Sequence, residues 1–259
     1  MENTKNNCYI NNIVYLVGEI GFGGTEKQMT LILRYLKNPH EKYHLIVFNH
    51  SYFGNLKKEL ISLGVEIYFI PKSINSIYKR LKYLINLIKR IKPKLIHSWT
   101  IHDNSYAYLV GAYLGISKTF GSVRGSLYGT SFAKLPELYK ISSIRFIPRI
   151  FVNTLSIRNE LIDYGINKSK ISVIANAVEP QHLTDYVINE NLPVICTIGN
   201  LRDNKNHETF VKIMKNVVEI FPKAEGWIIG QPVPDEPNQE KKIKKLIGEL
   251  NLFNSVKLM

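Results

Sequence analysis

The chain has 259 residues, 45% of them hydrophobic and 21% charged, and a formal net charge of +13. This is the composition of a globular protein with a sizeable core, and it excludes wholesale disorder, collagen-like chains and small disulfide scaffolds. Cys8 and Cys196 are the only cysteines, and neither belongs to a paired-cysteine or Cys/His motif. We therefore expect two reduced thiols and neither structural zinc nor a redox pair.

The positive charge is concentrated in the first part of the chain. Residues 1–188 hold 24 basic and 12 acidic side chains, whereas residues 189–259 hold 10 and 9. Such a field attracts nucleic acid, anionic lipid headgroups or phosphorylated small molecules, and by itself it does not choose among them. No run approaches the roughly 18 apolar residues of a membrane span, and the polar start is not a signal peptide, so we expect a cytoplasmic protein.

The first part of the chain alternates predicted strands and helices. A β-branched run at Asn12–Val17 leads into four glycines, and a helical pattern follows over Thr25–Leu36. This alternation predicts a parallel, doubly wound sheet with helices on both faces. The further expected strands are His44–Phe48, Val65–Ile70, Lys94–Ser98, Lys118–Val123, Arg149–Val152 and Ile171–Ile174. The further expected helices are Asn55–Leu63, Ile74–Ile91, Ser105–Leu114 and 155–164, and the stretch between 124 and 148 stays unassigned.

A second α/β unit is predicted beyond a polar, turn-rich break between Asn176 and Pro193. Its expected elements are Pro193–Ile198, a Gly199 loop, His207–Ile220, Glu225–Ile229, Gln239–Leu250 and a strand opening at Ser255–Leu258. We place the N-terminal domain at 1–180 and the second at 190–259. About 70 residues with so few strands bury their helices poorly, so this second domain is expected to be incomplete.

The glycine loop after the first strand is the main phosphate-binding candidate, because glycines permit close backbone approach and a helix N-terminus follows. The alternative is a tight turn without a ligand. The loop is not a dinucleotide fingerprint, because Glu26 stands where a third glycine is expected. The sequence also lacks GK[ST], DxD, GxSxG and HExxH motifs, so we expect neither a P-loop nor a metal.

The segment Gly21-Phe-Gly-Gly-Thr-Glu26 resembles the "GG-[AT]-E" opening of family 4 retaining glycosyltransferases. The resemblance continues in order through Leu95-Ile-His-Ser98, Phe151-Val-Asn-Thr154, Val173-Ile-Ala-Asn176-Ala-Val178, Ile198–His207 and Ile228-Ile-Gly230. Each motif alone is weak, but their order and the matching domain break make the set fairly specific. The resemblance covers nearly all of the chain and implies a GT-B fold with two Rossmann-like domains.

The resemblance implies a nucleoside diphosphate sugar as donor, with no cofactor and no metal. Lys205 matches the family lysine that neutralises the donor diphosphate, and the family arginine position is Asn200 here. Arg202, two residues on, is therefore our stand-in for the second cation, and both cations would stabilise the leaving diphosphate. The amides of Gly23 and Gly24 would approach the reacting sugar. A solvated Arg/Lys loop without a ligand is the alternative.

On the acceptor side the candidates are His102, Asp103, Asn104 and Arg124, all placed after predicted strands, where α/β sheets usually bind ligands. Family members often carry a histidine at the position of Arg124. An arginine is not a base at neutral pH, so at this position it would bind an anion or a sugar hydroxyl. A surface arginine in a glycine turn is the alternative.

Residues 72–94 contain eight Lys/Arg and no acid. Their apolar residues, placed on one face, are Ile74, Ile77, Tyr78, Leu81, Leu84, Ile85, Ile88 and Ile91, and the bases placed largely elsewhere are Lys79, Arg80, Lys82, Lys89 and Arg90. The basic face is either simply solvated, or a contact with anionic membrane that suits a lipid-linked acceptor, or a nucleic-acid contact. No recognised nucleic-acid module surrounds it.

The sequence thus predicts a glycosyltransferase of surface polysaccharide assembly, such as capsule or lipopolysaccharide. The alternatives are another GT-B sugar-nucleotide enzyme, for instance an epimerase, and a non-catalytic binding module. Family 4 enzymes carry an acidic "E-x7-E" segment beyond a strand like Ser255–Leu258, and this sequence does not contain it. We therefore expect either a fragment of a longer enzyme or a truncated natural product.

Overall fold

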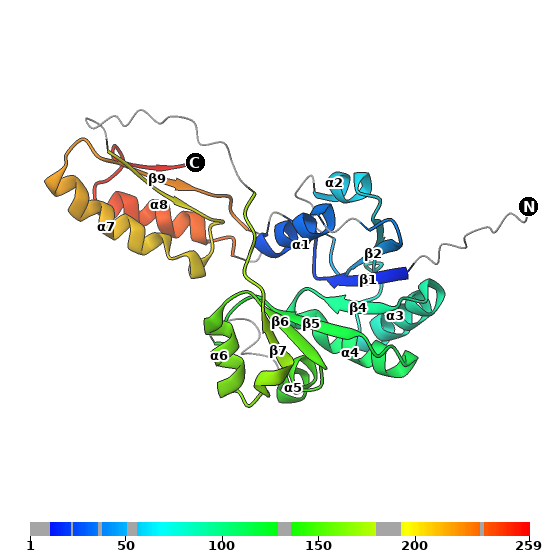
Figure 1. The fold of residues 1–259 in the computed structure, drawn as a ribbon. Coiled ribbons are helices and arrows are strands. Elements are labelled where there is room, and N and C mark those ends of the chain that lie inside the picture. The colour runs from blue at the N-terminus through cyan, green and yellow to red at the C-terminus, as the bar shows by residue number, and fades with distance from the viewer. Residues whose placement is uncertain are drawn as a thin grey trace, which may run out of the picture. The chain divides into compact units, whose positions relative to one another are not determined.

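The computed structural model describes residues 11–21, 23–35, 38–50, 56–128, 136–179, 193–233 and 236–259 (Figure 1). The chain forms two compact units, Met1–Pro180 and Gln181–Met259, which we call unit 1 and unit 2. Cys8, the ends Leu36 and Asn55 of two predicted helices, and most of the predicted break between the domains lie outside the described residues. Cys196 is an exposed free thiol.

Unit 1 is built on a seven-stranded sheet in the order β3-β2-β1-β4-β5-β6-β7, and each neighbouring pair is parallel. The order reverses between β1 and β4, as in a doubly wound sheet, which confirms the predicted fold class. The strands are β1 (Asn11–Val17), β2 (Glu41–Val47), β3 (Glu66–Phe69), β4 (Leu95–Ser98), β5 (Thr119–Val123), β6 (Arg149–Val152) and β7 (Ile171–Val173).

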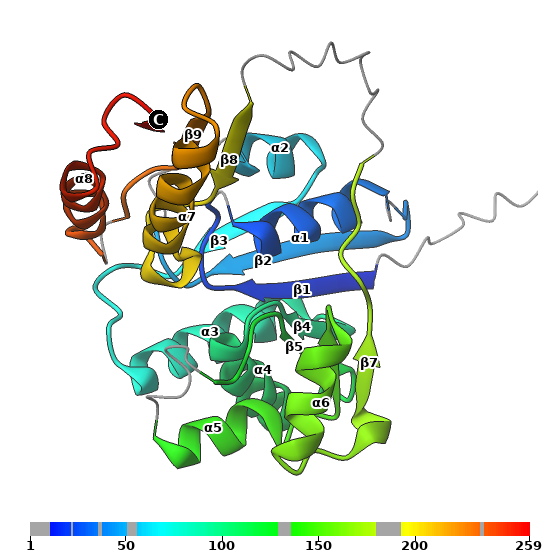
Figure 2. The same ribbon diagram turned by 90° about the vertical axis from the view of Figure 1, so that its left-hand side faces the viewer.

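Helices cover both faces of this sheet, with α1 and α2 on one side of the β1 region and α3 and α4 on the other (Figure 2). Successive residues of a strand point to opposite faces, so Tyr15 and Val17 of β1 pack toward α1 and α2 while Val14 and Leu16 pack toward α3 and α4. The helices are α1 (Gly24–Tyr35), α2 (Leu56–Ser62), α3 (Ile77–Ile91), α4 (Ile101–Leu114), α5 (Glu137–Ile144) and α6 (Leu155–Asp163). Of the helices in the described ranges, none is both long and apolar enough to span a bilayer.

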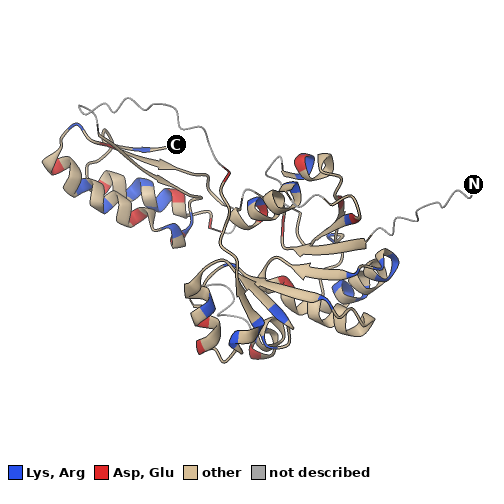
Figure 3. Cartoon of the chain, in the orientation of Figure 1, with Lys and Arg blue, Asp and Glu red and all other residues tan. Residues whose placement is uncertain are grey.

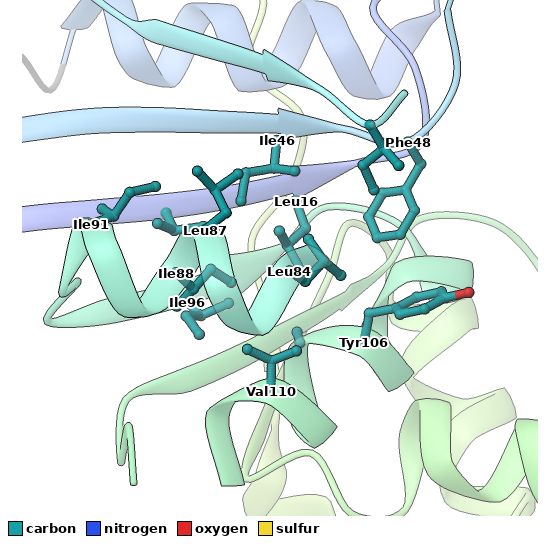
Figure 4. Packing of buried hydrophobic residues seen from close by; sticks show 13 residues of the cluster. Leu16, Ile46, Phe48, Leu84, Leu87, Ile88, Ile91, Ile96, Tyr106 and Val110 are labelled. Atoms are coloured by element: carbon teal, nitrogen blue, oxygen red, sulfur yellow. The ribbon is translucent and has the colours of Figure 1, made fainter. Parts of the chain in front are cut away.

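Helix α3 packs on β1, β2 and β4 through a stripe of aliphatic side chains (Figure 4). It begins at Ile77, three residues later than predicted, because Ser76 caps it by accepting the backbone N–H of Lys79 at 3.3 Å. The predicted stripe is wrong at its first turn, where Ile77 and Tyr78 are 59% and 74% exposed. Its buried residues are Leu84, Leu87, Ile88 and Ile91.

Two helices of unit 1 differ from the sequence prediction. Helix α4 begins at Ile101 and not near Ser105, with Thr100 as its N-cap residue. Helix α5 lies in the stretch left unassigned, and polar contacts fix it: Ser105 Oγ and Ser143 Oγ share a hydrogen bond of 2.6 Å, and the Tyr139 hydroxyl donates to the His102 carbonyl. These contacts join residues far apart in sequence, so periodicity does not reveal them.

The described part of unit 2 has a three-stranded parallel sheet in the order β10-β9-β8. Helices α7 and α8 bury Val211, Met214 and Ile243 against Ile228. This second, smaller parallel sheet agrees with the predicted second α/β unit. The elements are β8 (Val194–Ile198), α7 (His207–Ile220), β9 (Glu225–Ile229), α8 (Gln239–Glu249) and β10 (Val256–Leu258).

Candidate functional site

Four neighbouring strands of unit 1 end in residues able to bind a polar ligand. Trp99 follows β4, Arg124 follows β5, Asn153 follows β6, and Asn176 lies three residues beyond β7. Because the strands are parallel and adjacent in the sheet, their carboxyl ends share one edge, where doubly wound folds bind ligands. We call these four residues the carboxyl-edge cluster.

Arg124 is the centre of the carboxyl-edge cluster. Its guanidinium carbon lies 4.4 Å from the centroid of the Trp99 ring, and its Nη1 donates to Asn176 Oδ1 at 3.2 Å. Burial lowers the pKa of Arg124, although an arginine so placed remains protonated at neutral pH. The indole stacked against the cation and the amide bonded to it hold the guanidinium in a fixed place.

His97 of β4 lies beneath this cluster and is not a proton-transfer candidate. Its Nε2 is 2.9 Å from Ser122 Oγ, and its ring contacts Trp99 with centroids 5.2 Å apart. Burial, helped by the positive charge of Arg124, lowers the pKa of His97 to about 3. His97 is therefore neutral near pH 7 and adds no charge to the site.

The predicted acceptor-side residues His102, Asp103 and Asn104 lie in the first turn of α4 and not in a loop, which corrects the sequence prediction. Asn104 is fully buried, and its amide group bonds to the backbone of Ser122: Nδ2 donates to the carbonyl at 3.2 Å, and Oδ1 accepts the N–H at 3.1 Å. Asn104 therefore serves the fold and is unavailable to an acceptor.

Asp103 is also buried, and its carboxylate accepts the Thr100 hydroxyl. Burial raises the pKa of Asp103 to about 7, against the opposing effects of Thr100 and of the positive charge of Arg80. Its Oδ2 lies 3.8 Å from the position that a Cβ on Gly18 would occupy, so the carboxyl group faces the loop after β1. His102 is partly exposed, and burial lowers its pKa.

Gly23 and Gly24 are exposed at the start of α1. The Gly23 carbonyl accepts the Lys27 N–H at 3.1 Å, and the Glu26 carboxylate folds back onto Gly23 so closely that a Cβ there would overlap it. Burial raises the pKa of Glu26. Nothing in the described chain lies within 4 Å of a Cβ built on Gly24.

A groove of about 190 Å³ runs along α1 beside the glycines. Arg34 in this groove forms ion pairs with Glu59 and Glu179, so its charge is already compensated. The lining residues are Gly23, Lys27, Thr30, Leu31, Arg34, Leu56, Glu59 and Glu179.

In unit 2 the loop after β8 holds Asn200, Arg202 and Lys205, in and before a 3-10 turn over Asp203–Lys205. The Lys205 stem lies over Gly199, with Cγ and Cδ 3.3 Å from the position of a Cβ on that glycine. Within the described part of the chain, no carboxylate forms an ion pair with Lys205, and its side chain is exposed. This lysine is a cation open to an incoming anion.

Arg202 has a partner that the sequence did not suggest. Its Nη1 is 3.8 Å from Glu236 Oε1, and the other oxygen of Glu236 accepts the Asp203 N–H at 2.7 Å. The Glu236 charge therefore competes with any anion for Arg202. The Asn200 carbonyl accepts the Arg202 N–H at 2.7 Å and approaches His207 Nε2 at 3.2 Å, so Asn200 fixes the loop through its backbone.

The sequence prediction missed Trp99, Asn153, Asn176 and Glu236 as members of these sites. Asn153 and Asn176 stood within the quoted motifs, and their position just beyond the ends of predicted strands was the available signal. No group of three or more His, Cys, Asp and Glu among the described residues is suited to hold a metal ion.

Comparison with known proteins gives two family matches. The model of Glycosyltransferase Family 4 matches residues 22–182, and that of Glycosyl transferases group 1 matches residues 179–259. No curated protein matches the sequence significantly.

Solved structures resemble the chain over nearly all of its length. HepE from Anabaena, in complex with UDP and glucose, has a TM-score of 0.69 and 16% identity, over 95% of this chain and 68% of that chain. The lipopolysaccharide outer core galactosyltransferase WaaB, in its apo form, has a TM-score of 0.64 and 17% identity, over 95% and 67%. UDP-GlcNAc 2-epimerase from Neisseria meningitidis, bound to UDP-GlcNAc, has a TM-score of 0.58 and 16% identity, over 96% and 71%. At these identities the likeness shows the fold.

Proposed function

The chain belongs to glycosyltransferase family 4 and has the GT-B fold, and on this premise we propose that it transfers a sugar from a nucleoside diphosphate sugar to a glycan or lipid-linked acceptor. The transfer retains the anomeric configuration, as the resemblance implies, and takes part in assembly of a surface polysaccharide such as capsule or lipopolysaccharide. The proposal includes neither a metal nor another cofactor.

Lys205 is the observation that carries the donor assignment. It is an exposed lysine without an ion-pair partner among the described residues, placed over Gly199 at the carboxyl end of β8. A cation there stabilises the negative charge that develops on a leaving diphosphate, and electrostatic stabilisation of this kind is usually the largest single contribution to catalysis. The solved structures of HepE and of the epimerase contain UDP and UDP-GlcNAc, which supports a nucleotide-sugar donor.

The remaining donor residues have smaller parts in this proposal. Arg202 contributes a second cation, weakened by Glu236. Asn200 holds the loop and Gly24 leaves room for the donor beside the first turn of α1, whereas the Glu26 carboxylate fills the space at Gly23. On the acceptor side Arg124 is the main candidate, with His102 and Asp103 at the same edge of the sheet.

Helix α3 supports contact with an anionic membrane. Its Lys and Arg residues are the blue parts of the α3 ribbon in Figure 3, and Lys79, Lys82, Lys89 and Arg90 are exposed. Ile77 and Tyr78 add an exposed apolar first turn. Each base near an anionic surface contributes about 1 kcal/mol. Arg80 is not counted among the bases that contact the membrane, because its side chain is held by the protein. Its Nε donates to the Ile74 carbonyl at 3.3 Å, and its guanidinium lies 5.9 Å from the Phe48 ring centroid.

A donor assay on the intact chain tests the transferase proposal. A panel of nucleoside diphosphate sugars is incubated with the protein and membrane lipid extract, and release of the nucleoside diphosphate is measured. Lys205→Ala is expected to lower turnover about 100-fold or more, whereas Lys215→Ala, an exposed lysine on α7, leaves it unchanged. Equal turnover by Lys205→Ala and the parent chain contradicts the diphosphate role.

Chromatography of the sugar nucleotides in the same incubations tests the second candidate, a GT-B sugar-nucleotide epimerase, which the structural likeness to an epimerase favours. An epimerase changes the sugar of the donor itself, so the product is a new sugar nucleotide formed without an acceptor. Absence of both products, with retained binding of the nucleotide sugar, points to a non-catalytic binding module.

Cosedimentation with vesicles tests the membrane contact. Vesicles rich in anionic lipid are expected to retain the chain, and replacing Lys79, Lys82 and Lys89 by Ala weakens that retention. Replacing Lys241, Lys242 and Lys245 of α8 by Ala is a charge-matched control, since all three are exposed. Equal retention by neutral vesicles refutes the electrostatic attachment.

A further inference from the structure

The carboxyl-edge cluster contains a cation without a counter-charge. Ion pairs within the described residues use Arg34, Arg202 and several lysines, but none involves Arg124. Glu160 contacts the loop just beyond Arg124, yet its Oε2 is taken by Ser126 Oγ at 2.9 Å and the Leu127 N–H at 2.7 Å. The neighbouring His97 is neutral and supplies no negative charge.

The same cluster also concentrates unsatisfied polar atoms. Four buried side-chain polar atoms in the described chain have no hydrogen-bond partner, and three of them are Trp99 Nε1, Arg124 Nε and Asn153 Oδ1. Buried polar groups are usually paired in native proteins, so three such atoms at adjoining strand ends favour a polar ligand here. A partly buried cation without a counter-charge among the described residues is costly, and an anion that binds it offsets that cost.

The chemistry of a guanidinium limits the class of that anion. A planar fork of N–H donors matches the two oxygens of a carboxylate or a phosphate, and the pairing is stronger when the group is shielded from water. Stacking on Trp99 and the bond to Asn176 hold the fork in place before the ligand arrives, which lowers the entropy lost on binding.

We infer that Arg124 binds an oxyanion, a carboxylate or a phosphate group, carried by the acceptor of this enzyme. This rests on the proposed function, in which the donor already carries a diphosphate, and it narrows the acceptor from any glycan to an acidic or phosphorylated one. The negative group docks at the carboxyl edge of the unit 1 sheet, and a neutral hexose leaves the cation unpaired there.

Binding of small probes to the intact chain tests this directly. Glucuronate, inorganic phosphate and glucose are titrated separately against the protein, and ligand-observed NMR gives each dissociation constant. At least one anion is expected to bind about tenfold or more tightly than glucose. Preference for glucuronate identifies a uronic acid carboxylate as the source, and preference for phosphate identifies a phosphoryl group. Equal binding of all three probes overturns the inference.

Three variants assign the binding to Arg124. Measured in a Lys205→Ala background, so that the donor cation of unit 2 does not bind the probes, Arg124→Gln is expected to reduce anion affinity to that of glucose. Arg149→Gln removes the same charge from an exposed residue at the first position of β6, the opposite edge of the sheet, and leaves the affinities unchanged. Arg124→Lys keeps the charge but not the fork, so it binds anions several-fold more weakly than the parent while melting at a similar temperature. If either Arg124 variant folds and binds anions as the parent does, the inference is wrong.

The outcome is separable from that of the proposed function, because probe binding requires no turnover. If the protein binds anions selectively but transfers sugar to no acceptor, the oxyanion site is supported and the transferase proposal is contradicted. If the parent and Arg124→Gln transfer neutral sugars to neutral acceptors equally fast, the transferase proposal is supported and the oxyanion site is contradicted.

Discussion

The side-chain amide of Asn104 in α4 pairs with the backbone of Ser122 in β5, donating to its carbonyl and accepting its N–H. An amide side chain here acts as a short piece of neighbouring strand. Backbone pairing between β4 and β5 covers only Ile96 and His97 on the β4 side, so Asn104 continues the pairing from a helix where the strand has ended.

Replacing Asn104 by Ala is expected to lower the free energy of unfolding by about 2–4 kcal/mol, because two buried backbone groups of Ser122 lose their partners. Urea unfolding followed by circular dichroism measures the change. Asn86→Ala, at an exposed position of α3, serves as the control and is expected to unfold as the parent does. A stable Asn104→Ala protein contradicts the structural role assigned to this amide.

Gly230→Ala is expected to destabilise unit 2. A Cβ at this position overlaps the carbonyl oxygen of Gly199, so two backbone segments at the ends of β8 and β9 have to separate. Forced overpacking of this kind costs about 1–3 kcal/mol. The melting temperature of the variant measures it, and an unchanged value shows that the two loops do not approach so closely.

Gly24→Ala separates stability from activity. A Cβ there meets nothing within 4 Å in the described chain, and alanine loses less entropy than glycine on entering a helix, so stability is unchanged or higher by about 0.5–1 kcal/mol. If the donor approaches the backbone at Gly24, the added methyl displaces it and transfer falls at least about tenfold. The two readouts are a thermal melt and the donor assay. Full activity in the variant excludes close donor approach at Gly24.

Asp103 is expected to make stability depend on pH. Its pKa rises from 3.8 to about 7 in the folded protein, so the stabilisation is complete below about pH 4 and is lost as the pH rises through 7. Asp103→Asn removes this dependence, since an amide does not ionise. At pH 4 the melting temperature of the variant is therefore expected to be equal to or below that of the parent. At pH 8 the free energy of unfolding of the variant is expected to exceed that of the parent by up to about a few kcal/mol.

Melting temperatures of the parent and Asp103→Asn, recorded from about pH 4 to pH 8, provide the comparison. Burial also raises the pKa of Glu26, so the pH dependence of the parent reports on both carboxyl groups. The difference in melting temperature between the parent and Asp103→Asn reports on Asp103 alone. Parallel pH profiles for the two proteins contradict an ionisable buried Asp103.

The alternation of β-branched runs and amphipathic segments was sufficient to predict the sheet, because each strand needs only its own residues to be identified. The exact starts of the helices depend on single N-cap residues, which the pattern did not identify. With Ser76 as N-cap, α3 begins later than predicted, and with Thr100 as N-cap, α4 begins earlier, at Ile101. Helix α5 was missed because its position depends on hydroxyl contacts such as Ser143 with Ser105, which only the folded chain brings together.

The candidate site was also predictable only in part from the sequence. Arg124 was recognised because it follows a strand and replaces a family histidine. Its neighbours were not recognised, since Asn176 is 52 residues away and becomes a partner only through the order of β5, β6 and β7 in the sheet. Likewise Glu236 reaches Arg202 and Asp203 across 33 residues or more, so the loop sequence gave no sign of it.

The indole beneath Arg124 gives the protein an internal optical reporter. The chain has two tryptophans, and Trp99 lies in unit 1 while Trp227 lies in β9 of unit 2 with its Nε1 donating to Glu225. The tryptophan emission of a Trp227→Phe protein therefore comes from Trp99 alone. Since the guanidinium stacks on that ring, any ligand that draws Arg124 away changes the emission, and occupancy of this edge can be followed without a labelled substrate.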